Sequence, residues 1–404
     1  MRGAVPSPPG DAHRPALTVP VRGRPCRAAV ERAGLLSSKG HPPVFSGSSS
    51  STSSGSAPSL TRYGWDETWE QLALPHVEAG CLPGRVARVD RGRVDVLTDR
   101  GRLRADPGRR SALAVGDWVL LDPSRAADLL GVAAVLPRRT ALTRAASSGR
   151  SEAQVLAANV DTVLVAVALG TGSRPGRTER LVALAWESGA VPVLVLTKTD
   201  RAGDGPALAA AVDEAAAAAP GVAVLPVSAL TGEGVAAVAA TARGTTVLVG
   251  ASGAGKSTLA NALLGDEVLA VGEVRARDGK GRHTTVRREL VPFPGGVLVD
   301  TPGLRAVGVR DAAEGIDRTF ADVVELAAGC RFADCAHDRE PGCAVRDAVE
   351  RGDLPARRWE AHRELVREDE WAAARTDARL AAERRGRWKA ITRSQRAAYR
   401  QRGR

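Results

Sequence analysis

The spacing of hydrophobic and polar residues changes along the chain. Between residues 82 and 137, apolar and polar residues alternate in short segments separated by turns such as Asp90-Arg91-Gly92. Alternation with a period of two is typical of strands that bury one face. Four strands are predicted on this basis, at residues 84–89, 93–97, 116–121 and 130–136. Short strands that follow one another so closely indicate a small β-barrel.

From residue 158 onward, strand-like and helix-like segments alternate. Residues 160–169 are almost wholly apolar and rich in valine, as expected of a strand that is buried on both faces. Further strands are predicted at residues 191–196, 222–227, 245–249 and 296–299. Helices are predicted between the strands, at residues 179–188, 207–219, 234–240 and 257–264. This order predicts an α/β domain with a largely parallel sheet, and helical sequence returns from about residue 355.

The two ends of the chain differ from this middle part. Residues 1–60 are rich in Pro, Ser, Gly and Arg and show no apolar periodicity, which predicts a disordered extension. A transit peptide, which is also rich in Arg and Ser and poor in acids, is the alternative. Residues 384–404 contain nine Arg or Lys residues and no acid, so we predict a basic helical tail from residue 371 onward.

The composition excludes two classes of protein. The chain has 404 residues, of which 44% are hydrophobic and 25% charged, as in ordinary globular proteins. No apolar run reaches the 18 or so residues of a membrane-spanning helix, and the N-terminus has no secretory core. Five cysteines are too few for a disulfide scaffold. We therefore expect a cytoplasmic protein without a membrane segment, with Cys26 and Cys81 as free thiols.

Positive charge is concentrated in particular segments of this chain, whose net charge is +11. The region of the predicted barrel, residues 81–150, has 14 Arg and seven Asp. A basic segment of this kind suits a polyanion, most simply nucleic acid. We therefore favour an OB-type barrel that binds nucleic acid. A generic β-domain, with arginines that only aid solubility, is the alternative.

A phosphate-binding motif lies between a predicted strand and a predicted helix. Residues 250–258 read G-A-S-G-A-G-K-S-T and match the P-loop, whose backbone N–H groups wrap a phosphate at a helix N-terminus. Lys256 is predicted to neutralise the β- and γ-phosphate oxygens and Ser257 to bind Mg²⁺. A glycine-rich structural turn is the alternative. The predicted nucleotide-binding residues of this motif are Gly250, Ala251, Ser252, Gly253, Ala254, Gly255, Lys256, Ser257 and Thr258.

Residues downstream of the P-loop would complete the site around Mg²⁺ and the γ-phosphate. Asp300 follows an apolar strand and opens the motif D-T-P-G. It is predicted as the second magnesium ligand, with the N–H of Gly303 near the γ-phosphate. In the preceding motif G-R-H-T-T, Thr284 or Thr285 is predicted to close onto Mg²⁺ and the γ-phosphate as a switch residue. The sequence does not choose between these two threonines.

The group that orients the attacking water has its own candidate. Leu304 occupies the position where Ras-like GTPases carry a water-orienting Gln, and an apolar side chain cannot orient water. Hydrolysis must therefore use another group or be slow without a partner. His283, beside the switch threonines, is the catalytic candidate, and a solvent-facing loop histidine is the alternative.

Two short motifs favour guanine as the base. T-K-T-D at residues 197–200 follows an apolar strand and resembles the N-K-x-D motif of GTPases, with Thr in place of Asn. Its Asp would accept two hydrogen bonds from the guanine edge, and S-A-L at residues 228–230 resembles the supporting motif. Thr197 retains a hydroxyl but lacks the amide of Asn, which weakens the prediction of guanine specificity. An ATP-using kinase or ATPase is the alternative. The predicted base-binding residues are Thr197, Lys198, Thr199, Asp200, Ser228 and Ala229.

Three cysteines and one histidine lie close together after the predicted sheet. The run Cys330-x4-Cys335-x-His337-x5-Cys343 supplies three thiols and an imidazole, the donor set of a structural, tetrahedral Zn²⁺ site. No fifth donor is evident, so we predict a structural rather than a catalytic zinc. A disulfide or free buried thiols are the alternatives.

In these motifs and in their order, the chain resembles the ribosome small-subunit-dependent GTPases, the RsgA or YjeQ family. The base motifs precede the P-loop, as in a circularly permuted GTPase. The resemblance also rests on G-R-H-T-T, on D-T-P-G with an apolar residue next, and on C-R-F-A-D-C-A-H-D-R-E-P-G-C. It covers about residues 82–370. It implies a multidomain α/β protein with an N-terminal OB-type β-barrel, a circularly permuted P-loop GTPase domain and a C-terminal zinc-binding helical module.

The resemblance also implies a function. A protein of this family is expected to bind the small ribosomal subunit and its rRNA in late maturation, and to hydrolyse GTP to GDP and phosphate with stimulation by the subunit. We expect a monomer. A passive RNA-binding protein whose nucleotide only stabilises the fold is the alternative. The expected division is an extension at 1–60, the barrel at 82–140, the GTPase domain at 155–308, the zinc-binding module at 309–370 and the tail at 371–404.

Overall fold

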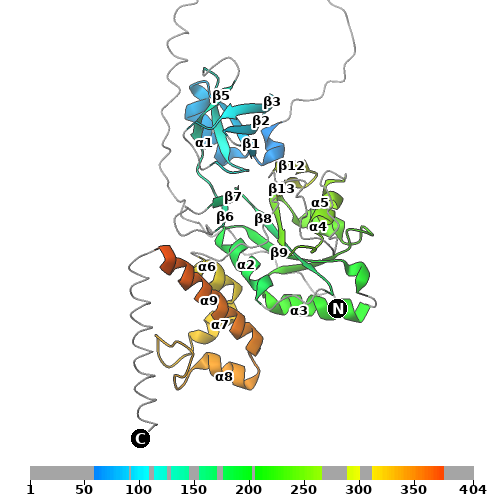
Figure 1. Cartoon of the computed structure of the whole chain (residues 1–404), viewed down its shortest axis with the longest axis vertical. Coiled ribbons are helices and arrows are strands. Elements are labelled where there is room, and N and C mark those ends of the chain that lie inside the picture. The colour runs from blue at the N-terminus through cyan, green and yellow to red at the C-terminus, as the bar shows by residue number, and fades with distance from the viewer. Residues whose placement is uncertain are drawn as a thin grey trace, which may run out of the picture.

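The computed structural model has three parts that follow one another along the long axis of the molecule (Figure 1). A barrel, a six-stranded sheet with helices on both faces, and a group of C-terminal helices succeed one another in chain order. The structure describes residues 59–90, 92–108, 113–124, 129–144, 154–170, 176–202, 205–265, 289–300 and 312–376. Residues 1–58 of the predicted extension at 1–60 and residues 377–404 of the predicted tail at 371–404 lie outside this set.

Five strands close the barrel in the order β1-β2-β3-β5-β4, which is the order of an OB-type barrel. β1 closes the barrel by pairing antiparallel with β4, while β3 and β5 pair parallel. Valine and leucine side chains that alternate along the strands fill the interior. β3 was not predicted, because its sequence Gly-Arg-Leu-Arg-Ala-Asp offers only a short alternation. The strands are β1 (Leu82–Asp90), β2 (Arg93–Thr98), β3 (Gly101–Asp106), β4 (Trp118–Asp122) and β5 (Leu130–Val135).

A short helical segment precedes the barrel and covers one of its sides. It consists of the 3-10 helix η1 (Leu60–Tyr63) and the helix α1 (Glu67–Glu78), which Asp66 caps by accepting a hydrogen bond from the N–H of Trp69. Trp69 is buried against Trp118 of β4. No element was predicted here, since Pro75 interrupts the helical pattern. The next turn holds Cys81, which is buried and disulfide-bonded, so the prediction of a free thiol there is wrong.

The central sheet has the strand order β10-β9-β8-β11-β13-β12. All neighbours are parallel except the edge strand β12, which is antiparallel to β13. The five parallel strands lie at predicted positions, whereas β12 was not predicted. The strands are β8 (Thr162–Ala168), β9 (Val191–Thr197), β10 (Ala223–Val227), β11 (Gly244–Gly250), β12 (Glu289–Phe293) and β13 (Gly296–Asp300).

Helices cover both faces of this sheet and create two cores. On one face, α2 and the end of α3 bury valine and alanine side chains against the strands. On the other face, α4 and α5 do the same with a separate set of residues. The helices are α2 (Arg177–Glu187), α3 (Gly205–Ala218), α4 (Val235–Thr241) and α5 (Lys256–Leu264). Such a doubly covered parallel sheet places the carboxyl ends of its strands at one edge, where ligands bind.

The C-terminal helices form a third unit that packs on α2. α6 packs most closely, because a Cβ on Gly315 would come 2.1 Å from the carbonyl oxygen of Ala183. Ile316 and Phe320 join Leu354 and Leu365 in the core of this unit. Only the last helix was predicted from sequence. The helices are α6 (Ala313–Thr319), α7 (Ala321–Ala327), α8 (Ala344–Arg351) and α9 (Ala356–Thr376).

The barrel and the sheet share one core. A single hydrophobic cluster contains Trp118 of the barrel together with Val247 and Val299 of the sheet. A two-stranded connection of β6 (Ala141–Arg144) and β7 (Gln154–Ala158) joins the two parts in the chain. The barrel is therefore packed against the sheet and is not an independent domain on a flexible linker. None of the described helices is long and apolar enough to cross a membrane.

A buried arginine reinforces this junction. Arg85 of β1 is 1% exposed, and its guanidinium donates hydrogen bonds to the carbonyl oxygens of Tyr63, Gly116 (3.2 Å) and Asn159 (3.3 Å). It also donates to the hydroxyl of Thr245 in β11 at 2.7 Å. One side chain of the barrel thus joins the N-terminal segment, the barrel turn and the strand that leads to the P-loop.

Candidate nucleotide site and zinc centre

The P-loop lies where β11 ends and α5 begins. Gly250 closes the strand so near to β8 that a Cβ would lie 2.4 Å from the carbonyl oxygen of Ala166. Gly253 and Gly255 have φ of +77° and +78°, the left-handed region that favours glycine. Ser252 and Gly253 are exposed at the tip. The loop therefore presents backbone N–H groups to solvent at a helix N-terminus, as a phosphate-binding loop must.

Lys256 points back across the loop. Its ammonium donates to the carbonyl oxygens of Gly250 at 3.0 Å and Ala251 at 2.6 Å. These bonds hold the positive charge over the loop, where a phosphate group would bind. Ser257 is exposed in the first turn of α5, so its hydroxyl is accessible to a ligand.

The base motif meets the P-loop from the neighbouring side. Thr197, the last residue of β9, is buried, and its hydroxyl donates to the carbonyl oxygen of Ala254 at 2.7 Å. A Cβ on Gly255 would lie 3.5 Å from that hydroxyl oxygen. The sequence treats Thr197 as a base contact, whereas in the structure its hydroxyl joins the T-K-T-D motif to the P-loop. Residue spacing alone could not reveal this contact.

Asp200 is fixed by the other base motif. Its carboxylate accepts a hydrogen bond at 2.8 Å from the hydroxyl of Ser228, a fully buried residue just after β10. Lys198, two residues before Asp200, has φ of +63°. Non-glycine residues rarely adopt this conformation, and those that do are often at functional sites. Thr199 and Ala229 continue the same two loops and are partly buried. The ends of β9, β10 and β11 thus bring the three motifs together.

The remaining predicted residues of the nucleotide site are not all described. Asp300 is the last residue of β13, the strand beside β11, but its side chain lies outside the described set. His283, Thr284, Thr285, Gly303 and Leu304 also lie outside the described residues. Their roles stay predictions.

Exchange of Asp200 for Asn should change the preferred base. A carboxylate accepts hydrogen bonds from the N1–H and amino group of guanine, whereas an amide places a donor against those donors. Because a hydrogen bond to a charged group contributes about 1.5–3 kcal/mol, Asp200→Asn should weaken GTP binding by about 100-fold. Xanthosine triphosphate, which has a carbonyl in place of the amino group, should bind better to the variant than to the wild type.

Equilibrium titration with fluorescent analogues of both nucleotides would measure these affinities. Asp213→Asn, which changes an exposed acid on α3, is the matched control and should behave as the wild type. Equal weakening of both nucleotides in Asp200→Asn would contradict the role of Asp200 in base recognition.

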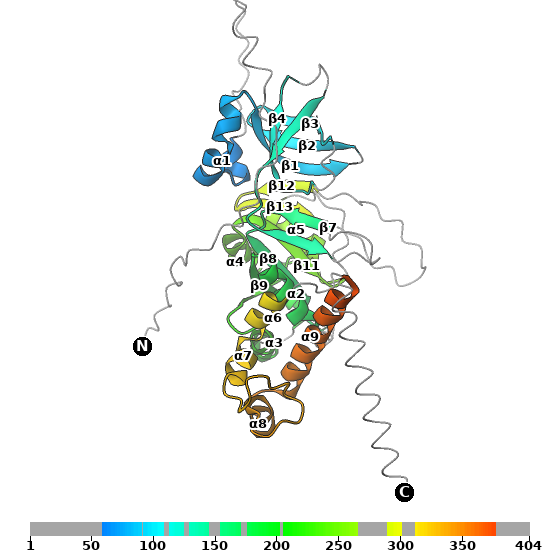
Figure 2. The same cartoon turned by 90° about the vertical axis from the view of Figure 1, so that its left-hand side faces the viewer.

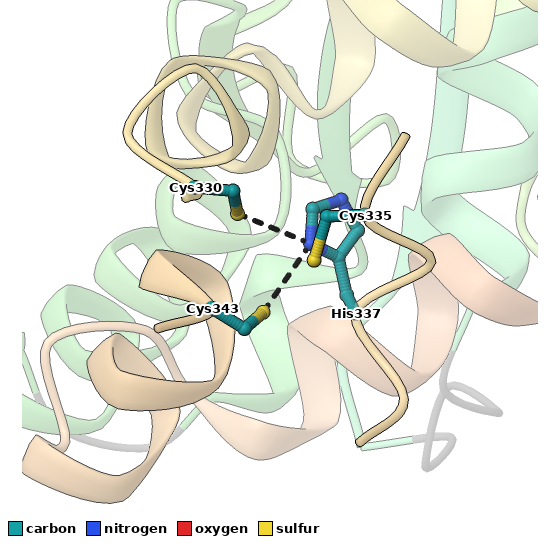
Figure 3. Close-up of side chains that lie close together, drawn as sticks. All are labelled: Cys330, Cys335, His337 and Cys343. Carbon is teal, nitrogen blue, oxygen red and sulfur yellow. Dashed lines mark hydrogen bonds between the residues drawn. The ribbon is translucent and has the colours of Figure 1, made fainter. Parts of the chain in front are cut away.

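The second site gathers all four predicted zinc ligands (Figure 3). The three Sγ atoms and the imidazole nitrogen of Cys330, Cys335, His337 and Cys343 lie within 4.8 Å of one another. Nδ1 of His337 is 3.4 Å from Sγ of both Cys330 and Cys343. Zn–S bonds of about 2.3 Å in a tetrahedron place sulfur atoms roughly 3.8 Å apart, so this cluster has the size of a zinc site.

The loop that carries these ligands has backbone hydrogen bonds of its own. Cys330 follows α7, Cys343 caps α8, and the N–H of Arg331 donates to the carbonyl oxygen of Gly342 at 3.0 Å to close the loop between them. The carboxylate of Glu340 accepts from backbone N–H groups of its own loop, which lowers the pKa of Glu340 to about 2. His337 has φ of +58°. These features aim the four donors at a common centre.

The donor set fits a structural zinc ion. Without a cation, burial together with the neighbouring thiols of Cys343 and Cys330 raises the pKa of the Cys335 thiol to about 11. Zn²⁺ reverses this effect because it binds the thiolate form. Among the described residues, the cluster forms no disulfide. The alternative of a disulfide among these cysteines is therefore wrong.

Comparison with known proteins decides the family. Residues 135–310 match the family model of the RsgA GTPase. The small ribosomal subunit biogenesis GTPase RsgA of Streptomyces coelicolor is 53% identical over 331 residues, covering 80% of this chain and 89% of that protein. The protein of the same name from Opitutus terrae is 43% identical, covering 76% of this chain and 89% of that protein.

The chain belongs to the RsgA family. It is therefore a GTPase, a hydrolase of GTP, as the motifs predicted. The crystal structure of YjeQ from Thermotoga maritima is similar with a TM-score of 0.55 and 25% identity, covering 71% of this chain and 99% of that one. YloQ, described as a circularly permuted GTPase, has a TM-score of 0.50 and 22% identity, covering 71% of this chain and 94% of that one.

These comparisons confirm the predicted family and fold class. The closed barrel, the permuted order of the GTPase motifs and the cysteine–histidine cluster that the resemblance implied all occur in this chain. Because the chain belongs to the RsgA family, the alternative that the P-loop belongs to an ATP-using kinase or ATPase is wrong. Sequence reasoning missed the role of Arg85, which was counted with the other arginines of residues 81–150 and is buried at the junction.

Proposed function

We propose that this GTPase acts in biogenesis of the small ribosomal subunit, binding the subunit and its rRNA and hydrolysing GTP to GDP and phosphate when the subunit stimulates it. The 53% identity to the small ribosomal subunit biogenesis GTPase of Streptomyces coelicolor is the observation that carries this proposal. The exposed arginines of the barrel support it, because rRNA is a polyanion. Action as a monomer, in the cytoplasm where ribosomes are assembled, is part of the proposal.

In the nucleotide site, each motif has one task. Asp200, held by Ser228, would select the base, while the P-loop amides and Lys256 would bind the phosphates. Ser257 and Asp300 would hold Mg²⁺, since hydroxyl and carboxylate oxygens are the ligands it prefers and their elements α5 and β13 flank one strand. When bound, Mg²⁺ neutralises charge on the β- and γ-phosphates.

The hydrolytic step would depend on residues outside the P-loop. Thr284 or Thr285 would position the γ-phosphate, with the N–H of Gly303 on its other side, and His283 would orient the attacking water. A site that lacks a glutamine after the D-T-P-G motif is expected to be slow alone, which suits stimulation by the subunit. The four ligands Cys330, Cys335, His337 and Cys343 would hold one structural zinc, so that the loop they carry keeps its shape against rRNA.

Phosphate release from GTP and ATP, with and without purified small subunits, tests this function. The wild type should hydrolyse GTP in preference to ATP, and the subunit should stimulate it strongly. Lys256→Ala should lower GTP affinity and turnover by about 100-fold or more, because the ammonium contributes charge-assisted hydrogen bonds to the phosphates.

The control removes an equivalent charge elsewhere. Arg243→Ala changes an exposed arginine just before β11, at the end of the strand opposite the P-loop, and should retain wild-type turnover. Wild-type turnover in Lys256→Ala would contradict the nucleotide site. If the subunit does not raise the rate of GTP hydrolysis by the wild type, the result would contradict the proposed function. It would favour the alternative of a passive RNA-binding protein whose nucleotide only stabilises the fold.

A further inference from the structure

One arginine of the barrel bonds to the edge strand of the GTPase sheet. Arg102 and Arg104 project outward from β3 and are both exposed. Between them on β2 lies the carboxylate of Asp95, 3.7 Å from a guanidinium nitrogen of Arg102 and 3.4 Å from Nε of Arg104. The same nitrogen of Arg102 is 2.7 Å from a carboxylate oxygen of Glu289. Arg102 thus has a carboxylate partner in each domain, whereas Arg104 has its partner in the barrel.

Glu289 occupies a sensitive place in the GTPase sheet. It is the first residue of β12, and its register partner in β13 is Asp300, the predicted magnesium ligand. Along the chain, only three residues separate Glu289 from Thr285. Figure 2 shows β12 and β13 directly below β1 of the barrel, so the barrel rests on the hairpin that these two strands form. A force on the side chain of Glu289 therefore acts on the strand beside Asp300.

The ion pair is of the kind that a polyanion can displace. The side chains of Arg102 and Glu289 are 45% and 35% exposed, and half-exposed ion pairs contribute little to stability and are screened by salt. A phosphate offers the guanidinium two acceptor oxygens in a matching plane, a stronger arrangement than a single carboxylate oxygen. An RNA backbone that runs over β3 would contact Arg104 and Arg102 together.

We propose that Arg102 exchanges Glu289 for a phosphate of the RNA backbone when the barrel binds RNA. The exchange frees β12 from the barrel and thereby couples RNA binding to GTP turnover. This proposal rests on the proposed function, because it names the contact through which an rRNA-bearing partner acts on the nucleotide site. Coupling is reciprocal: any state of the GTPase domain that withdraws Glu289 also makes Arg102 available to RNA.

Glu289→Gln is the informative variant, because it removes the competing charge in the GTPase domain and leaves Asp95 and both arginines in place. It should bind a fluorescein-labelled single-stranded RNA of twelve uridines about threefold more tightly than the wild type, the effect expected of one exposed ion pair. Its basal GTP turnover should rise by a similar factor, and the remaining stimulation by small subunits should fall. Fluorescence anisotropy and phosphate release measure these quantities.

Arg104→Gln is the matched control on the same strand. It should weaken RNA binding as much as Arg102→Gln does, but only Arg102→Gln should change basal turnover without RNA. The double exchange Arg102→Glu with Glu289→Arg rebuilds the pair in reverse. It should restore wild-type basal turnover while RNA binding stays weak, a rescue that loss of structure cannot produce.

The outcomes separate this proposal from the proposed function. Wild-type RNA affinity and wild-type basal turnover in Glu289→Gln would overturn the exchange of partners, even if small subunits stimulate the wild type. Failure of small subunits to stimulate the wild type would overturn the proposed function, while the effect of Glu289→Gln on oligonucleotide binding would still be measured. Equal changes in Arg104→Gln and Arg102→Gln in both assays would also overturn the specific role of Arg102.

Discussion

Arg85→Ala should lower the free energy of unfolding by about 3–5 kcal/mol, because it removes hydrogen bonds to four buried acceptors. The guanidinium donates to three backbone carbonyls and to the hydroxyl of Thr245, and it lies 4.9 Å from the centre of the Trp118 ring. None of these groups reaches water in the folded protein, so alanine would leave a cavity lined with polar atoms.

Part of this loss of stability is offset, because the alanine variant no longer buries a positive charge. Burial lowers the pKa of Arg85 to about 10, which means that keeping the charge inside the protein costs free energy. Arg85→Met, which fills the space without the charge, should therefore destabilise less than Arg85→Ala. The order of the two variants separates the loss of volume from the loss of hydrogen bonds.

Urea unfolding followed by circular dichroism and tryptophan fluorescence would measure both effects. In Arg85→Ala the transitions seen by both probes should move to lower urea, because the barrel and the sheet share one core. Arg93→Ala changes an exposed arginine on β2 and should stay within about 0.5 kcal/mol of the wild type. A stability of Arg85→Ala equal to that of Arg93→Ala would contradict the role of Arg85 at the junction.

Removal of zinc should have the second large effect. Binding of a structural zinc contributes an apparent 10–16 kcal/mol to folding of small zinc domains. Here the helices α6–α9 share a core of their own, so the loop at 331–342 and the start of α8 should lose their structure before the rest of the module. A strong chelator should therefore expose this loop to protease while nucleotide binding persists.

Cys343→Ser tests the same point by mutation. Cys343 is 1% exposed and caps α8, so the serine variant should copurify with less than one zinc per chain and be cut in the loop. Asp338→Asn, in the same loop but not among the donors, should retain its zinc. Elemental analysis of the purified wild type is the decisive measurement, and a wild type without zinc would contradict the assignment.

The sequence predicted those elements whose pattern is local. The apolar run that starts at Val160 predicts a strand buried on both faces. The P-loop motif predicts the strand before it and the helix after it. α1 was missed because Pro75 lies within it, and β12 because its sequence Glu-Leu-Val-Pro-Phe contains a proline, which is found mainly on edge strands. Elements whose formation depends on a distant partner carry no such local pattern.

The chemistry of the site was predictable to the same extent. The four predicted zinc ligands are close in sequence, so their short spacing alone keeps them close in space. Thr197 and Ala254 are far apart in sequence, so their hydrogen bond could come only from the fold. The charge of the barrel was misleading in part: Arg85 is buried, Arg138 pairs with the buried Asp117, and Arg139 pairs with Asp66. These arginines hold the protein together, and fewer remain for RNA than the count suggested.

The core shared by barrel and sheet also constrains how the protein is synthesised. The barrel strands leave the ribosome first, but β13, which contributes Val299 to their common cluster, follows more than a hundred residues later. At roughly 5–20 residues per second this interval lasts on the order of ten seconds. For about the first hundred residues of this interval, the guanidinium of Arg85 has no Thr245 to bond. A nascent chain that stops early therefore carries an unfinished barrel, and the barrel matures only together with the GTPase domain.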